Sequence, residues 1–218
     1  MFQTKDKVLT IHTADEPTSV AFPPADFGFI NVLETAQDTK TLFKNLWNTP
    51  ASRTLLMAFS RHKRHNKLAA MANFYAIESW EYFDTITLQY EKTLGSNNGR
   101  FVPISEQAVL FYKGDQPDAG QTSWFSESRT NATNLWDVNA RPEEGNEFTY
   151  SGRFSWEMGL LLYSMCKPLA FRTMLYTLDT DHENAIAFAR HLKLKMHTVL
   201  KDDDQAKLMI KEYEGKYG

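Results

Sequence analysis

The chain has 218 residues, of which 42% are hydrophobic and 13% aromatic, and a chain of this size buries roughly 70% of its unfolded surface on folding. This composition excludes a disordered chain, and the single cysteine, Cys166, excludes an internal disulfide framework. The formal net charge of -3 excludes a basic field over the whole protein of the kind that marks many nucleic-acid binders. The sequence has no apolar run of about 18 residues and no signal-peptide core at its start, so we expect a cytoplasmic protein with no membrane partner.

Short β-rich runs alternate with segments of helical periodicity, and this alternation is typical of a parallel sheet with helices on its faces. Two of the β-rich runs flank a loop rich in glycine and asparagine, which predicts an antiparallel pair. The segment at about 114–154 is polar and predicts an irregular lobe. In chain order, the predicted strands cover 8–12, 19–22, 54–59, 85–91, 107–112, 172–178 and 195–200, and the predicted helices cover 39–47, 67–77, 155–164, 183–192 and 202–213.

These elements predict one α/β domain over residues 1–218, with a doubly wound, mostly parallel sheet of seven strands that carries an antiparallel edge strand. Gly215 predicts the C-cap of the last helix. Trp124, Trp136 and Trp156 either present stacking surfaces for bases or a partner, or are buried.

Four short motifs stand in a particular order along the chain. Pro23-Pro24 follows the predicted strand over 19–22, and residues 100–106, Arg-Phe-Val-Pro-Ile-Ser-Glu, precede the predicted strand over 107–112. Lys167-Pro168 opens a segment that leads to the strand over 172–178, and an acidic turn follows that strand. Over nearly the whole chain this order resembles the permuted (β-class) DNA amino-methyltransferases, which methylate the exocyclic amine of adenine or cytosine. The resemblance implies a Rossmann-like, S-adenosylmethionine-dependent methyltransferase fold.

The resemblance places the catalytic tetrapeptide, Asp/Asn/Ser-Pro-Pro-Tyr/Phe in the family, at Phe22, Pro23, Pro24 and Ala25. Phe22 cannot accept a hydrogen bond from the target amine, and burying that amine without an acceptor costs about 1–3 kcal/mol. Ala25 cannot stack on a flipped base, a contact worth about 1–3 kcal/mol, although Phe27 is aromatic and stands two residues further on. The motif therefore predicts a degenerate catalytic position.

The cofactor positions depart from the family pattern as well. The resemblance places them at Thr177, Asp179, Thr180, Asp181 and Leu200. The family has a glycine-rich loop after this strand and an acidic residue for the ribose at the later position, whereas this chain has no glycine between Gly159 and Gly215. Glycine lets a backbone turn tightly and approach a ligand, and the acidic side chains here suit a helix start instead. We therefore expect no cofactor, with S-adenosylmethionine as the cofactor if the chain is active.

A dense basic run, Arg-His-Lys-Arg-His over residues 61–65, follows the predicted strand over 54–59 at its carboxyl end. Ligands of open α/β sheets bind at such ends, so the run is compatible with contact to nucleic-acid phosphates and also with a solvated helix start. The candidate nucleic-acid-binding residues are Arg61, His62, Lys63, Arg64 and Arg100.

Two further acidic clusters are open to a functional and a structural interpretation. Asp179, Asp181, His182 and Glu183 form either a divalent-metal cluster or a capping-rich turn, and we expect the turn and no metal site. The run 202–204, Asp-Asp-Asp, predicts the charged start of the last helix.

These observations lead to the hypothesis of a catalytically inactive, methyltransferase-like pseudoenzyme that binds DNA and associates with a methyltransferase-like partner or a second copy of itself. One alternative is a divergent active adenine or cytosine amino-methyltransferase whose reacting groups come from positions such as Asp26, Phe27 or Asp179. Another is an enzyme that uses the cleft for a different donor, with a metal at the cluster of residues 179–183. The resemblance suggests a phage or restriction-modification setting.

Overall fold

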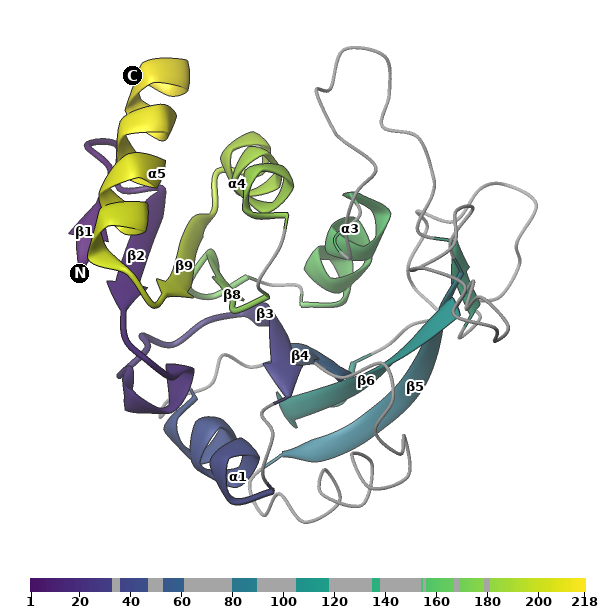
Figure 1. Cartoon of the computed structure of the whole chain (residues 1–218). Helices are drawn as coiled ribbons and strands as arrows, with labels where there is room; N and C mark the ends of the chain where they lie inside the picture. Colours follow the sequence, from purple (N-terminus) through teal and green to yellow (C-terminus); the bar gives the residue numbers. More distant parts are fainter. Residues whose placement is uncertain are drawn as a thin grey trace, which may run out of the picture.

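The computed structural model describes residues 1–32, 36–46, 53–60, 80–89, 105–117, 135–137, 154, 156–166, 169–178 and 181–218. Among these residues lie nine strands and their connecting helices (Figure 1). The strands are β1 (Phe2–Gln3), β2 (Leu9–Thr13), β3 (Phe27–Val32), β4 (Arg53–Ser60), β5 (Glu81–Gln89), β6 (Ser105–Gly114), β7 (Leu135–Asp137), β8 (Thr173–Tyr176) and β9 (Lys195–Leu200). The helices are the 3-10 helix η1 (Pro17–Ser19) and the α-helices α1 (Ala36–Asn45), α3 (Trp156–Met165), α4 (His182–His191) and α5 (Asp203–Tyr217).

The strands form one sheet in the order β1-β2-β9-β8-β3-β4-β6-β5-β7. The five strands from β2 to β4 in this order are parallel, which confirms the predicted mostly parallel α/β sheet. The predicted antiparallel pair is also present as β5 and β6. However, β6 lies between β4 and β5 inside the sheet, and the antiparallel edge strand is the short β1.

Helices cover both faces of the sheet. In Figure 1, α3, α4 and α5 lie on one side of the sheet and α1 lies on the other. On the first face, Phe27, Phe29 and Met196 belong to a large buried cluster with side chains of these three helices. On the second face, Ile30 and Leu175 belong to a smaller cluster with side chains of α1. Each face therefore has its own apolar core, as expected for a doubly wound sheet.

Three predicted elements differ from the structure. The strand predicted over 19–22 is wrong, because the chain forms η1 at Pro17–Ser19 and the strand follows later as β3. The last helix continues through Gly215 to Tyr217, so Gly215 is not its C-cap. The lobe at about 114–154 contains the three-residue strand β7, and the helix predicted over 67–77 lies outside the described residues.

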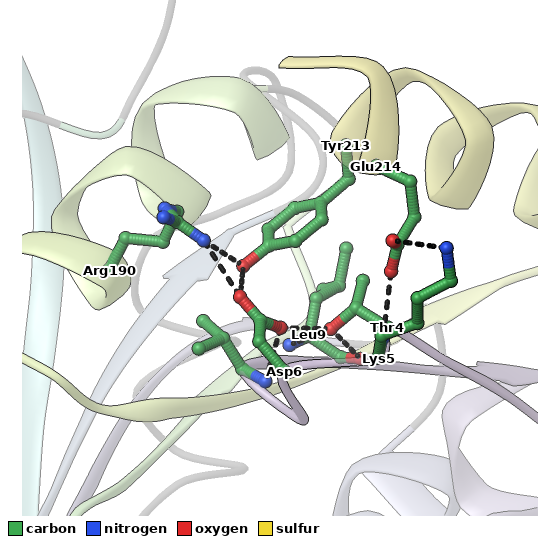
Figure 2. Close-up of polar contacts among 8 residues, drawn as sticks. Thr4, Lys5, Asp6, Leu9, Arg190, Tyr213 and Glu214 are labelled. Carbon is green, nitrogen blue, oxygen red and sulfur yellow. Dashed lines mark hydrogen bonds and ion pairs between the residues drawn. The ribbon is translucent and has the colours of Figure 1, made fainter. Parts of the chain in front are cut away.

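A polar network joins the amino terminus to the last two helices at the amino end of β2 (Figure 2). The Tyr213 hydroxyl donates to Oδ2 of Asp6 at 2.5 Å, and Nη1 of Arg190 donates to the same oxygen at 2.7 Å. Burial, with the hydrogen bond to Asp6, raises the pKa of Tyr213 to about 12, so its hydroxyl remains a donor at neutral pH. Next to it, the Lys5 backbone N–H donates to Oε1 of Glu214 at 2.7 Å.

No helix in the described part of the chain has the length and apolarity needed to cross a bilayer.

Candidate functional site

The connections of the sheet reverse direction between β8 and β3. From β8 the chain passes through α4 to β9 on one side, and from β3 it passes through α1 to β4 on the other side. Ligands of doubly wound sheets bind beyond the carboxyl ends of the strands at such a switch point. Phe29 of β3 pairs with Tyr176 of β8, and the Thr177 backbone N–H donates to the Phe29 carbonyl at 2.9 Å. Asn31 near the end of β3 and Thr177 directly after β8 thus mark the candidate site.

Asn31 is a functional candidate that sequence reasoning missed. It stands one residue before the end of β3, is 4% exposed, and pairs with Phe59 of β4. Its amide can both donate and accept hydrogen bonds, and it is the polar residue that β3 brings to the switch point. The signal was present as an apolar run, Phe27–Val32, in which Asn31 is the only polar side chain and which precedes the helix predicted over 39–47.

The predicted tetrapeptide does not lie at this edge. Phe22, Pro23, Pro24 and Ala25 precede β3, in the connection that leaves the carboxyl end of β2 and reaches the amino end of β3. Phe22 and Ala25 are 6% and 1% exposed and pack in the core on the α1 face. Phe27 is the first residue of β3 and is completely buried on the opposite face. Val20 and Phe22 are buried and Ala21 between them is exposed, which is why this part of the chain resembled a strand.

Asp26 serves the fold at the amino end of β3. Its Oδ1 accepts hydrogen bonds from the backbone N–H groups of Ala170 and Phe171 at 2.7 and 3.1 Å, and its Oδ2 accepts one from Thr173 at 3.0 Å. The Cys166 thiol donates to the Asp26 carbonyl at 3.1 Å. Asp26 and Cys166 are both fully buried, so the carboxylate anchors the turn before β8.

Two residues at the start of α4 contact neighbouring segments near the carboxyl end of β8. Asp181 precedes α4 with φ 63°, in the left-handed region, and its side chain makes no capping hydrogen bond to the helix. Instead, its Oδ2 accepts a hydrogen bond from the Phe154 backbone N–H at 3.4 Å. The ring of His182 meets the ring of Tyr176 edge-on, with 5.5 Å between centroids. Asp179 and Thr180 lie outside the described residues.

An aromatic cluster lies under this turn on the face covered by α3 and α4. The ring of Phe154 is 5.1 Å from Phe29, 5.8 Å from Tyr176 and 5.5 Å from Phe188, measured between centroids. Gly159 of α3 allows this packing, because a Cβ there would lie 2.6 Å from the Phe188 ring. Trp156 packs on Phe188 with 5.0 Å between centroids.

The later cofactor position and the acidic clusters have structural partners. Leu200, the last residue of β9, pairs with Thr13 and is partly buried against the larger core. Asp202 caps α5, since its Oδ1 accepts a hydrogen bond from the Asp204 backbone N–H at 2.7 Å, as predicted for a charged helix start. Within the described ranges, no group of three or more metal-ligating side chains is close enough to hold an ion.

The candidate nucleic-acid-binding residues lie outside the described part of the chain: Arg61, His62, Lys63, Arg64 and Arg100. Trp124 lies outside it as well. The strand before the basic run is described: β4 ends at Ser60, which pairs with Val32 at the end of β3. The chain therefore enters the basic run from the same edge of the sheet as Asn31.

Comparison with known proteins shows the fold. No protein-family model matches the sequence, and no curated protein is significantly similar to it. The crystal structure of M1.HpyAVI is similar with a TM-score of 0.59 and 11% identity, covering 94% of this chain and 98% of that chain. The crystal structure of the M1.HpyAVI-SAM complex is similar with a TM-score of 0.55 and 11% identity, covering 90% and 95%. The chain therefore shares the α/β fold of these two structures.

Proposed function

We propose that this chain is a methyltransferase-fold pseudoenzyme that binds DNA and does not seat S-adenosylmethionine at the switch point. The observation that carries the proposal is the turn after β8, where the Asp181 carboxylate and the His182 ring pack against Phe154 and Tyr176. Glycine at such a turn leaves room for a ligand, whereas Asp181 and His182 fill it with side chains. The order of the strands along the chain, with β3 and β4 before β8 and β9, supports the permuted arrangement that the sequence resembles.

The proposed DNA surface is the basic run at residues 61–65 with Arg100. It begins directly after Ser60, at the edge of the sheet where ligands of this fold class bind. Arginine and lysine contacts to phosphates supply affinity without reading sequence, so this run suits a protein that occupies DNA. In this proposal the lobe at about 114–154 contributes target recognition within a single domain. The chain associates with a second copy of itself or with a methyltransferase-like partner, and any methyl transfer comes from that partner. Such a role fits a phage or restriction-modification setting.

Fluorescence anisotropy with a labelled DNA duplex, recorded over a series of salt concentrations, tests this proposal. Removing three cations with Arg61→Ala, Lys63→Ala and Arg64→Ala is expected to lower the slope of log affinity against log salt by about 2–3, since each phosphate contact contributes about 0.9. The matched control removes three cations from α5, with Lys207→Ala, Lys211→Ala and Lys216→Ala. Equal losses in both triple variants, or no DNA binding by the native chain, would overturn the DNA-binding proposal.

A second candidate function is a divergent DNA amino-methyltransferase. It is favoured by Asn31, a residue that is 4% exposed and lies one position before the end of β3, beside the switch point. An amide there can accept a hydrogen bond from a target amine. Transfer of a radiolabelled methyl group to mixed-sequence DNA by the native chain, together with loss of transfer in Asn31→Ala, would establish this candidate and overturn the inactive assignment. No incorporation by either protein supports the pseudoenzyme.

A further inference from the structure

Two histidines meet on neighbouring strands, away from the switch point. His12 lies on β2 and His197 on β9, and Nε2 of His12 is 3.1 Å from Nδ1 of His197. The parallel register pairs His12 with Val199, so the two histidines are diagonal neighbours on one face of the sheet. The ring of Phe22 meets the His12 ring edge-on, with 5.3 Å between centroids, and limits its rotation.

Both imidazoles are neutral at physiological pH. Burial lowers the pKa of His12, and the amino terminus at Met1 adds to the shift. Burial lowers the pKa of His197 to about 4, helped by the nearby His12 and Lys195. A neutral imidazole has a free lone pair on one ring nitrogen, and this neutral form is the one that binds metals. Both side chains are half-buried, so water reaches the pair.

We propose that His12 and His197 together bind a late first-row divalent metal, such as Zn²⁺ or Cu²⁺, through Nε2 of His12 and Nδ1 of His197. Two metal–nitrogen bonds of about 2.05 Å at a tetrahedral angle separate the nitrogens by about 3.3 Å, close to the 3.1 Å observed. Binding needs only a change of tautomer. In the metal complex the proton of His12 is on Nδ1 and the proton of His197 is on Nε2, which leaves a lone pair on each of the two facing nitrogens. No proton is lost from either ring.

The ligand type selects the metal. The charged groups that act on the pair from the described parts of the chain, Lys195 and the Met1 ammonium, are both positive and oppose any cation that the two nitrogens bind only weakly. Mg²⁺ and Ca²⁺ require oxygen ligands, whereas imidazole suits zinc and copper. Because no third protein ligand stands near the pair within the described residues, water completes the coordination and the ion exchanges. The bound ion joins β2 to β9, and so links the beginning of the chain to its end.

Isothermal titration of the untagged full-length chain with ZnSO₄ and with CuCl₂ tests the site. The native chain is expected to bind one equivalent of each with a Kd on the order of micromolar, and Mg²⁺ is expected to give no heat. His12→Gln and His197→Gln are each expected to weaken binding at least about ten-fold. His191→Gln is the matched control, because this histidine packs on Trp156 at the end of α4.

A second measurement needs no variant. The electron paramagnetic resonance spectrum of the one-equivalent copper complex of the native chain is expected to show coupling to two imidazole nitrogens. The proposal is overturned if the native chain binds neither Zn²⁺ nor Cu²⁺, if His191→Gln weakens binding as much as the paired variants do, or if the spectrum shows fewer than two nitrogens. None of these outcomes depends on DNA binding or methyl transfer.

Discussion

The Phe154 backbone N–H donates a hydrogen bond to Oδ2 of Asp181 at 3.4 Å, which joins the segment before α3 to the turn before α4. Asp181 therefore points its carboxylate into the protein rather than toward the start of α4, where an aspartate usually caps. Together with the His182 ring on Tyr176, this contact places two side chains at the start of α4 beside the carboxyl end of β8. We base the proposal that S-adenosylmethionine is not bound on these two contacts.

The left-handed backbone of Asp181 gives the first prediction. Glycine adopts φ near 63° without strain, and aspartate tolerates it, whereas a β-branched side chain does not. Asp181→Gly is expected to change the free energy of unfolding by less than about 1 kcal/mol, and Asp181→Val is expected to lower it by about 1–3 kcal/mol. Urea unfolding of the two variants checks this, and equal losses would contradict the assigned backbone.

Two glycines in helices are expected to respond oppositely to alanine. A Cβ on Gly159 would lie 2.6 Å from two atoms of the buried Phe188 ring, so Gly159→Ala is overpacked and is expected to lose about 1–2 kcal/mol of unfolding free energy. Nothing lies within 4 Å of a Cβ on Gly215, and Gly215→Ala is expected to gain about 0.5–1 kcal/mol from helix propensity. Thermal and urea unfolding measure both, and a gain in both variants would refute the close contact of α3 with Phe188.

The Asp26 carboxylate is expected to be essential for stability. Asparagine keeps one acceptor oxygen and places an NH₂ group against backbone N–H donors, so Asp26→Asn is expected to lower the unfolding free energy by about 2–4 kcal/mol. Asp15→Asn changes an exposed carboxylate and is expected to stay within about 0.5 kcal/mol of the native chain. If urea unfolding gave equal values for the two variants, the three backbone hydrogen bonds to Asp26 would contribute nothing.

The network of Asp6, Arg190 and Tyr213 makes stability depend on pH. Burial raises the pKa of Asp6, but hydrogen bonds from Tyr213, Thr4 and the Val8 N–H and the charge of Arg190 together lower it below the ordinary value of 3.8. The unfolded chain therefore binds a proton more readily than the folded chain, and the stabilisation is present above about pH 4 and lost as the pH falls through the lower folded pKa.

We expect the unfolding free energy of the native chain to fall more steeply below about pH 4 than that of Asp6→Asn. In a Tyr213→Phe background, Asp6→Asn is expected to change the pH dependence of the unfolding free energy less than it does in the native chain, because the hydroxyl that donates to Asp6 is removed. Tyr217→Phe keeps the ring under Arg190 and serves as the control. Parallel pH profiles for the native chain and Asp6→Asn would contradict the assignment.

The sequence predicts the layered fold because buried parallel strands are almost wholly apolar. Thr173–Tyr176 is buried at every position, and such a run between two helical patterns has few other interpretations. The position of β3 was not predictable in the same way. Val20 and Phe22 alternate like a strand, but they bury one side of an extended connection against the sheet. Local alternation does not distinguish a strand inside a sheet from a segment packed across its face.

The departures of the candidate site from the family pattern were visible in the sequence, whereas its polar residue Asn31 was not. The sequence has no glycine after β8, and in the structure Asp181 contacts Phe154 while His182 contacts Tyr176. Asn31 was missed because the strand was predicted to end before the paired prolines, at Phe22, whereas β3 ends ten residues later at Val32. The contact of His12 with His197 depends on the pairing of β2 with β9, which joins residues 185 positions apart.

Calorimetric titration of the native chain with S-adenosylmethionine tests the central claim most directly. With Asp181 and His182 packed at the carboxyl end of β8, we predict no saturable binding tighter than about 1 mM. Binding of one equivalent with a micromolar Kd would contradict the account, because the turn would then have to admit the ligand that its side chains are proposed to exclude.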